Sequence, residues 1–269
     1  MKVLVLTLLL LLTLWAQERL ISLSPSITEI IYALDKGNEL VATSSYSLYP
    51  KKAQKLPIIG GYENPHLEKI LSYKPSLVIG QTFNSSSLNE LKHFGVKTLI
   101  LDLKSIDSIK KSIAILAKEI GSANDIKLIK DINIALKNAH KAQNNKKVMI
   151  VYGLKSDLRS GIYIAGNSIF FNEIIQECGA TNAYTSDNTN QPVLAYENII
   201  ALNPDIIIIL HSHATESSID VDKALASWKS IPTTASKNNE IHIIDDDYLH
   251  IPSHRIALTI KRLCGVIND

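Results

Sequence analysis

Histidine and tyrosine side chains follow two of the short apolar runs in this sequence. His211 and His213 come directly after residues 205–210, and Tyr248 and His250 come soon after the next apolar run. Imidazole and phenolate groups are good ligands or hydrogen-bonding partners for a transition metal held in a chelate. These side chains could therefore contact a bound ligand or its metal, with a solvated polar loop as the alternative for each histidine.

A wider set of residues shares this position at the end of an expected strand. In open α/β sheets, ligands bind at the carboxyl ends of the strands. The candidate ligand-binding residues are Tyr46, Tyr49, Tyr62 and Phe83 in the first half of the chain, and Arg159, His211, His213, Asp247, Tyr248 and His250 in the second half. Arg159 could pair with a carboxylate of the ligand, or it could lie in a surface loop.

The two cysteines of the chain, Cys178 and Cys264, are 86 residues apart. Two cysteines exclude a disulfide-dense scaffold and a multi-cysteine metal or iron–sulfur module. Neither is flanked by a histidine or a basic helix start that would favour a reactive thiolate. The residues alone leave two possibilities open, which are a disulfide and a pair of buried thiols.

The first 16 residues have the pattern of an export signal. Lys2 is their only charge, and residues 3–15 are apolar except for two threonines. A positive start followed by a short apolar run is typical of a signal peptide, and this run is shorter than the ~20 residues of a spanning helix. We expect cleavage near Ala16 and an exported protein, in which a disulfide would persist. An uncleaved membrane anchor is the alternative.

The composition indicates a globular protein without a charge bias. The chain has 269 residues, of which 46% are hydrophobic, and a formal net charge of +2. This length suits one large domain or two modest lobes, and the charge gives no electrostatic reason to expect nucleic acid as a partner. The sequence has no Gly-x-Ser-x-Gly, phosphate-loop or His-Glu-x-x-His motif. We therefore expect no enzyme, with an exported hydrolase as a remote alternative.

Strands and helices that alternate along the chain must position these candidates. Short runs rich in Val and Ile alternate with amphipathic stretches, which predicts parallel sheets with helices on their faces. Residues 124–143 differ, because they keep helical spacing without Gly or Pro and predict one helix of about 20 residues, ~30 Å long. The simplest fold is therefore α/β, with two lobes joined by this helix. The expected segments are a signal peptide at 1–16, an N-terminal lobe at 17–122, a connecting backbone helix at 123–144 and a C-terminal lobe at 145–269.

An internal repeat supports two lobes. Residues 68–79 align without a gap with residues 197–208, with four identities in twelve positions. Both segments have an acidic helix start, a short apolar helix, a proline and an apolar strand, although any short helix–Pro–strand unit shares part of this pattern. If the lobes are related by a rotation, Glu68 and Glu197 occupy equivalent outer positions.

Several segments together resemble the periplasmic substrate-binding proteins of metal-chelate importers. This family delivers cobalamin, ferric siderophores or haem to an ABC permease. The cobalamin-binding branch is the most similar, because it shares the short length, residues 44–50 and both cysteines. The matching segments are residues 19–26 (RLISLSPS), 28–29 (TE), 44–50 (SSYSLYP), 67–70 (LEKI), 74–78 (KPSLV), 165–168 (AGNS), 178–179 (CG), 203–205 (NPD) and 252–255 (PSHR).

The resemblance implies a fold and a set of roles. The fold would be two Rossmann-like lobes bridged by a single long α-helix, with the ligand cleft between the lobes. Cys178 and Cys264 would form a disulfide, and Glu68 and Glu197 would dock onto arginines of the permease dimer. The protein would be a periplasmic monomer without an intrinsic cofactor, and its ligand would be an iron or cobalt chelate. The residues that could contact the metal, only through the bound chelate, are His211, His213 and Tyr248.

The tryptophan count departs from the cobalamin-binding branch, which lines its cleft with tryptophans. Trp228 is the only tryptophan after residue 16, and Tyr62, Gln81 and Val193 stand near positions where that branch tends to have Trp. Because a corrin ring needs flat apolar contact, this favours a more polar chelate, such as a ferric siderophore, haem, or a nickel or cobalt complex.

Two further alternatives keep the fold but change the function. One is a receptor for free zinc or manganese, which would need several ligands at one point. The other is a ligand-sensing module without a transporter. The residues that could hold the free metal ion are His66, His211, His213 and Asp247.

Overall fold

The computed structural model describes residues 18–141, 143–186, 191–211 and 219–269. The expected signal peptide and His213 lie outside these ranges. Within them, no helix is both long and apolar enough to cross a membrane. The chain forms two compact units, an N-terminal unit (Met1–Thr28 and Lys36–Ile100) and a C-terminal unit (Glu29–Asp35 and Leu101–Asp269).

The N-terminal unit is built on a four-stranded sheet with the order β2-β1-β3-β4. The central strand β1 pairs in parallel with β2 and β3, and Leu20 lies opposite both Leu40 and Leu77. Nearly all residues of these three strands are buried, as expected of parallel strands that helices cover on both faces. The strands are β1 (Leu20–Ser22), β2 (Leu40–Thr43), β3 (Leu77–Gln81) and β4 (Thr98–Leu101).

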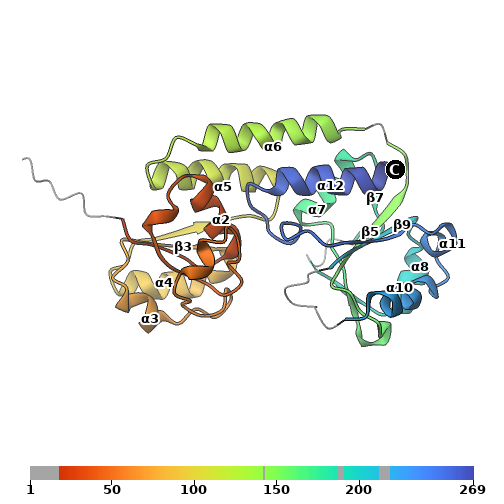
Figure 1. Cartoon of the computed structure of the whole chain (residues 1–269), viewed down its shortest axis with the longest axis horizontal. Coiled ribbons are helices and arrows are strands. Elements are labelled where there is room, and N and C mark those ends of the chain that lie inside the picture. Colours follow the sequence, from red (N-terminus) through yellow and green to blue (C-terminus); the bar gives the residue numbers. More distant parts are fainter. Residues whose placement is uncertain (1–17, 142, 187–190, 212–218) are drawn as a thin grey trace, which may run out of the picture. The chain divides into compact units, whose positions relative to one another are not determined.

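Short helices surround this sheet (Figure 1). Ile70 of α3 and Leu88 and Leu91 of α4 are fully buried and pack with Ile21 and Val78 of the sheet in one apolar core. The α-helices are α2 (Pro25–Ala33), α3 (Leu67–Ser72) and α4 (Ser85–His93), and the 3-10 helices are η1 (Gly37–Glu39), η2 (Ala53–Lys55) and η3 (Thr82–Asn84).

The C-terminal unit contains a second four-stranded sheet with the order β10-β9-β5-β7. Strand β9 pairs in parallel with both β5 and β10. When the strands of each unit are counted along the chain, both sheets have the order 2-1-3-4, so the two units share one topology. The α/β fold with two parallel sheets is confirmed. The strands are β5 (Lys147–Tyr152), β7 (Thr181–Asn182), β9 (Ile206–Leu210) and β10 (Ile241–Ile244), and a separate antiparallel ribbon pairs β6 (Ile162–Tyr163) with β8 (Val193–Leu194).

Helices cover both faces of the second sheet (Figure 1). Met149 and Ile207 of the strands pack with Ile199, Ala224 and Trp228 of the helices α8 and α10. Helix α12 contacts α7 and α6, and α6 also contacts α5. The helices of this unit are α5 (Ile106–Glu119), α6 (Asp125–Ala139), η4 (Leu158–Ser160), α7 (Phe170–Glu177), α8 (Tyr196–Leu202), α10 (Val221–Lys229), α11 (Thr234–Asn238) and α12 (Ile256–Asn268).

The long helix expected at 124–143 is shorter in the structure. Helix α6 has 15 residues and ends at Ala139. Beyond it, the backbone N–H groups of Lys141 and Asn144 donate to the carbonyl oxygens of Glu177 and Gly179, at 3.0 and 2.7 Å. These acceptors, at and just beyond the C-terminal end of α7, replace the bonds that would continue the helix. The segment boundaries expected at residues 122 and 144 stay a prediction.

The internal repeat has a clear structural counterpart. Helices α3 and α8 begin 129 residues apart, at Leu67 and Tyr196, and strands β3 and β9 have the same offset. Lys74 and Asn203, which are equivalent in the repeat, have φ angles of 47° and 44°. This left-handed conformation is uncommon for residues other than glycine. The two helix-to-strand turns therefore share a backbone conformation, although the residue types at this position differ.

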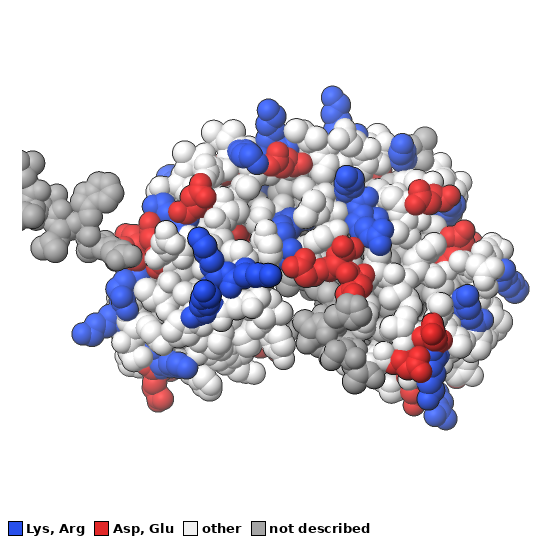
Figure 2. Space-filling model, viewed as in Figure 1, with Lys and Arg blue, Asp and Glu red and all other residues white. Residues whose placement is uncertain are grey.

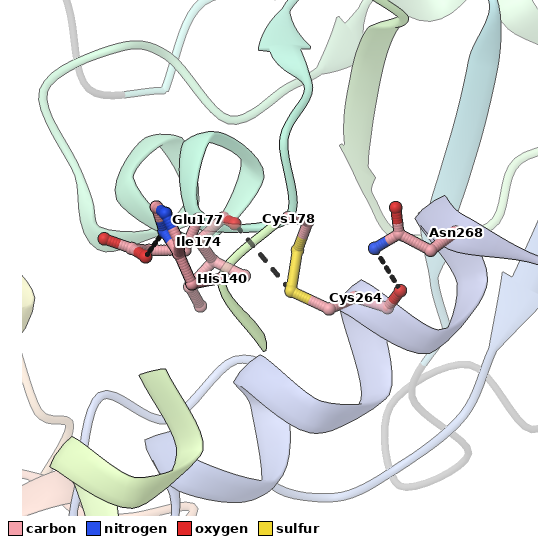
Figure 3. Close-up of a disulfide and its surroundings, with 6 residues drawn as sticks. All are labelled: His140, Ile174, Glu177, Cys178, Cys264 and Asn268. Atoms are coloured by element: carbon pink, nitrogen blue, oxygen red, sulfur yellow. Dashed lines mark hydrogen bonds and ion pairs between the residues drawn. A yellow bond between two sulfur atoms is a disulfide. The ribbon is translucent and has the colours of Figure 1, made fainter. Parts of the chain in front are cut away.

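A disulfide joins Cys178 and Cys264 within the C-terminal unit (Figure 3). Cys178 follows the last residue of α7, Cys264 lies in α12, and the two Cα atoms are 5.0 Å apart. Ile174 and Glu177 of α7 lie beside the bridge, and Glu177 contacts His140 at 3.1 Å. The bridge implied by the resemblance is confirmed, and it joins the end of α7 to α12.

His254 lies just before α12 and is largely buried. Burial, together with the nearby charges of Arg255 and Lys127, lowers the pKa of its imidazole from 6.5 to about 4. Its Nδ1 atom has no hydrogen-bond partner in the described part of the chain. The folded C-terminal unit therefore holds this imidazole in the neutral form at neutral pH.

Removing the disulfide should destabilise the protein. In the chain-entropy model, a bridge that closes a loop of 86 residues stabilises the fold by about 4–5 kcal/mol. We expect the double variant Cys178→Ser/Cys264→Ser to lose about this much free energy of unfolding in a guanidinium titration. A reductant should lower the unfolding midpoint of the wild-type protein and leave that of the variant unchanged. An unaltered wild-type midpoint in reductant would contradict a stabilising bridge.

The buried imidazole should make stability depend on pH. Because the pKa of His254 is about 4 in the folded chain and 6.5 without the fold, the unfolded chain binds more protons between these values. Stability is therefore complete above about pH 6.5 and falls as the pH drops towards 4. We expect His254→Gln to remove about 2 kcal/mol of the stability loss that urea unfolding measures between pH 7 and pH 4.5. The exposed His93 serves as the control, because His93→Gln should keep the wild-type loss, and an equal loss in both variants would refute the assignment.

Candidate functional site

Several aromatic side chains of the N-terminal unit are exposed, and we call three of them, Tyr46, Tyr62 and Phe83, the N-terminal aromatic group. Tyr46 follows β2, Phe83 follows β3, and the rings of Tyr62 and Phe83 meet edge to face with centroids 5.8 Å apart. Partial burial raises the pKa of the Tyr62 phenol, and Glu63 and Tyr46 raise it further. The group therefore offers neutral, flat apolar surface together with phenolic hydroxyls.

A buried asparagine holds part of this group in place. The Asn84 side chain donates to the carbonyl oxygen of Tyr62 at 2.6 Å and accepts from the backbone N–H of Gln81 at 3.0 Å. It thereby ties the backbone of Tyr62 to η3, which carries Phe83. Sequence reasoning missed Asn84. Its only signal was its place beside Phe83 in the segment that follows the strand.

A tight turn presents Tyr46. Its φ angle is 64°, and the neighbouring Ser45 N–H donates to the carbonyl oxygen of Gly60 at 2.9 Å. Gly60 has a φ of 119°, and a Cβ atom there would lie 2.8 Å from the backbone oxygen of Asn64, so only glycine fits. Tyr49 lies in the same segment and is also exposed.

The carboxyl ends of three neighbouring strands form one row in the C-terminal unit. Leu210, the last residue of β9, pairs with Tyr152 of β5 and with Ile244 of β10. His211 follows in this row and is buried. His250 comes from the loop after β10, and its ring lies 5.9 Å from that of Tyr152. The parallel pairing therefore brings residues from three distant parts of the sequence to one edge of the sheet.

Tyr152 and two phenylalanines belong to this edge, and sequence reasoning missed them. The ring of Tyr152 meets that of Phe171 at 5.8 Å, and Phe171 stacks on Phe170 at 4.3 Å. Burial raises the pKa of Tyr152, and a hydrogen bond to Gln191 lowers it by a smaller amount. Because Tyr152 ends a strand, the rule that selected the other candidates also applied to it.

The loop after β10 carries Asp247, Tyr248 and His250 and is tied to the start of α12. The Arg255 guanidinium donates to Asp247 at 2.7 Å and lies 5.7 Å from the ring centre of Tyr248. Burial raises the pKa of Tyr248, and the nearby carboxylate of Asp246, to which it is hydrogen-bonded, raises it further. Asp247 and Tyr248, which are neighbours in the sequence, thus both lie against the Arg255 guanidinium.

Arg159 has a different partner from the residues of this loop. Arg159 lies in η4 with an exposed side chain, which bonds Asp157 at 3.0 Å. His213 lies outside the described residues. Their assignment to the ligand stays a prediction.

Glu68 and Glu197 have matching environments in the two units. Each is the second residue of its helix, α3 or α8, and each is exposed. Among the described residues, neither carboxylate has a recorded hydrogen bond or ion pair. The two acids are therefore accessible for contact with another molecule.

The charged residues show no strong bias. Acidic and basic side chains are interspersed with uncharged residues over the face drawn in Figure 2. Across the described ranges, no three or more His, Cys, Asp or Glu side chains form a group that could hold a metal ion.

Comparisons with known proteins support a single family. The periplasmic binding protein family matches residues 20–248. The vitamin B12-binding protein of Vibrio vulnificus is 31% identical over 261 residues, covering 92% of this chain and 89% of the relative. The periplasmic haem-binding protein RhuT from Roseiflexus sp. RS-1, solved in apo form, has a TM-score of 0.77 and 25% identity, covering 93% of this chain and 97% of that one.

A further solved structure supports the fold. The periplasmic vitamin B12-binding protein BtuF of Vibrio cholerae has a TM-score of 0.77 and 24% identity, covering 93% of this chain and 96% of that one. The family match spans most of the chain and includes both sheets. The resemblance suggested by the sequence motifs is therefore confirmed, and the chain belongs to the periplasmic binding protein family.

Proposed function

We propose that this chain is an exported solute-binding protein that delivers a metal chelate to the permease of an ABC importer. The chelate is haem, a corrinoid or a ferric siderophore. The observation that carries this proposal is the family match over residues 20–248, joined by relatives whose names specify vitamin B12 and haem. The protein acts by binding, as a monomer in the periplasm, without catalysing a reaction.

The aromatic residues suit a flat chelate. Tyr46, Tyr62 and Phe83 expose ring surface at the N-terminal unit, and large aromatic side chains bury ~150–250 Å² each when covered. We propose these rings as one surface that a flat ligand contacts. The loop that carries Tyr248 and His250 is a separate candidate contact in the C-terminal unit. A phenol or imidazole from the C-terminal unit would reach the metal only through the bound chelate.

The tryptophan of the C-terminal unit takes no part in this contact. Trp228 of α10 is 0% exposed and packs in the apolar core of the C-terminal unit. A corrin-binding surface on this chain would therefore rely on tyrosine and phenylalanine. Haem or a more polar chelate is therefore as good a candidate for the ligand as a corrinoid.

We further propose that Glu68 and Glu197 dock the loaded protein onto its permease. Both carboxylates are exposed at equivalent places of the internal repeat. A partner made of two similar subunits could present one arginine to each carboxylate, and such pairs fix orientation as well as contributing energy.

Ligand identity can be tested by absorption spectroscopy. We expect the purified protein to shift the visible band of one compound among haem, cyanocobalamin and ferric catecholates. Tyr248→Phe should weaken that shift, because it removes a hydroxyl beside the proposed ligand. The control Tyr196→Phe alters an exposed tyrosine at the start of α8 and should bind like the wild-type protein. The absence of a shift with all three kinds of chelate would refute the proposal.

Docking can be tested separately in cells. We expect Glu68→Ala/Glu197→Ala to lower chelate uptake by roughly tenfold or more, because each charge-assisted hydrogen bond contributes ~1.5–3 kcal/mol. Binding of the chelate to the purified variant should be unchanged. Glu90→Ala/Asp222→Ala removes one exposed acid from a helix of each unit and should leave uptake intact. Normal uptake by the Glu68/Glu197 variant would exclude the docking role.

A further inference from the structure

Arg255 makes an unusual set of contacts at the start of α12. Its side chain is only 7% exposed. The Nε atom donates to Oε2 of Glu29 at 2.9 Å, Nη2 donates to the other oxygen of that carboxylate, and Nη1 donates to Oδ1 of Asp247 at 2.7 Å. One guanidinium is therefore shared between two carboxylates from different parts of the chain.

The contact with Glu29 anchors this arginine. Glu29 is 3% exposed and also accepts a hydrogen bond from the Ser253 hydroxyl at 2.5 Å. That hydroxyl oxygen in turn accepts from the backbone N–H of Arg255 at 3.2 Å. Burial lowers the pKa of Arg255, but its contacts with Glu29 and Asp247 outweigh that effect and raise it. The bidentate pair thus keeps the guanidinium charged and in one orientation.

The contact with Asp247 has a different character. The side chain of Asp247 is 67% exposed, and exposed ion pairs contribute little to stability. The same guanidinium lies 5.7 Å from the ring centre of Tyr248. Two residues further along, His250 packs on Tyr152. The main effect of the Arg255–Asp247 bond is therefore to restrict where residues 247–250 can lie.

We propose that Arg255 is a positioning residue for ligand binding. Held by buried Glu29, it orders the segment that carries Asp247, Tyr248 and His250 before the ligand arrives. Ordering a binding segment in advance lowers the entropic cost of binding. This inference rests on the proposed function for its effect on affinity, whereas the ordering of residues 247–250 in the free protein does not depend on it.

The first test uses the free protein. Amide hydrogen exchange of residues 248–250 should become about twofold to fivefold faster in Asp247→Asn and in Arg255→Lys, because a lysine cannot bridge both carboxylates. The control Arg19→Lys alters an exposed arginine of the N-terminal unit, which donates to the carbonyl oxygen of Tyr73 at 2.9 Å, and should leave the exchange unchanged. Unchanged exchange in Asp247→Asn overturns the proposal, and this variant decides alone if Arg255→Lys does not fold.

The second test measures affinity for whichever of haem, cyanocobalamin or ferric catecholate binds the wild-type protein. Asp247→Asn and Arg255→Lys should each weaken binding by roughly tenfold, and the double variant should be no weaker than the weaker single one. Additive losses would mean that the two residues act separately and would overturn the positioning role. If no chelate binds the wild-type protein, the proposed function fails, while the exchange experiment still decides whether Arg255 orders the segment.

Discussion

Parallel pairing of neighbouring strands is the constraint on which both units depend. A parallel strand needs a crossover connection, so helices must return the chain to the same edge of the sheet each time. The carboxyl ends of β5, β9 and β10 are consequently adjacent, although up to about a hundred residues separate them in the chain. The same strand order in both sheets repeats this geometry in the N-terminal unit. The candidate residues lie at these ends because the backbone pairing places them there.

Burial of charge shapes the C-terminal unit in a second way. A carboxylate such as Glu29 can be buried only if hydrogen bonds and an opposite charge replace its lost hydration. Arg255 and Ser253 provide both, so the start of α12 is tied to α2. Because Arg255 has donors left over, it also reaches Asp247. One buried ion pair thereby determines the course of an exposed loop. The disulfide joins the second half of α12 to the end of α7.

The limits of a helix or strand are predicted correctly where the local sequence pattern determines them. They are predicted wrongly where a contact with a distant residue ends the element. Strand β5 forms where the sequence has a run rich in Val and Ile, because such a run bounded by polar residues marks a buried strand. Helix α6 ends early because carbonyl groups at the C-terminal end of α7 accept from the N–H groups of Lys141 and Asn144. No local pattern reveals that competition. Asn84 was missed for the same reason, since its role comes from Tyr62, which is distant in the sequence. Tyr152, by contrast, ends a strand, so the rule used for the other candidates could have selected it.

The sequence by itself determined the fold class, the family and the internal repeat, because each is written in local patterns and short motifs. It also marked Glu68 and Glu197 through the repeat. Only the tertiary structure decided which candidates meet, as His250 does with Tyr152, and which have a different partner, as Arg159 does. It alone showed that Arg255 is shared between Glu29 and Asp247. The physical reason is that such contacts join residues whose separation along the chain carries no information about their distance in space.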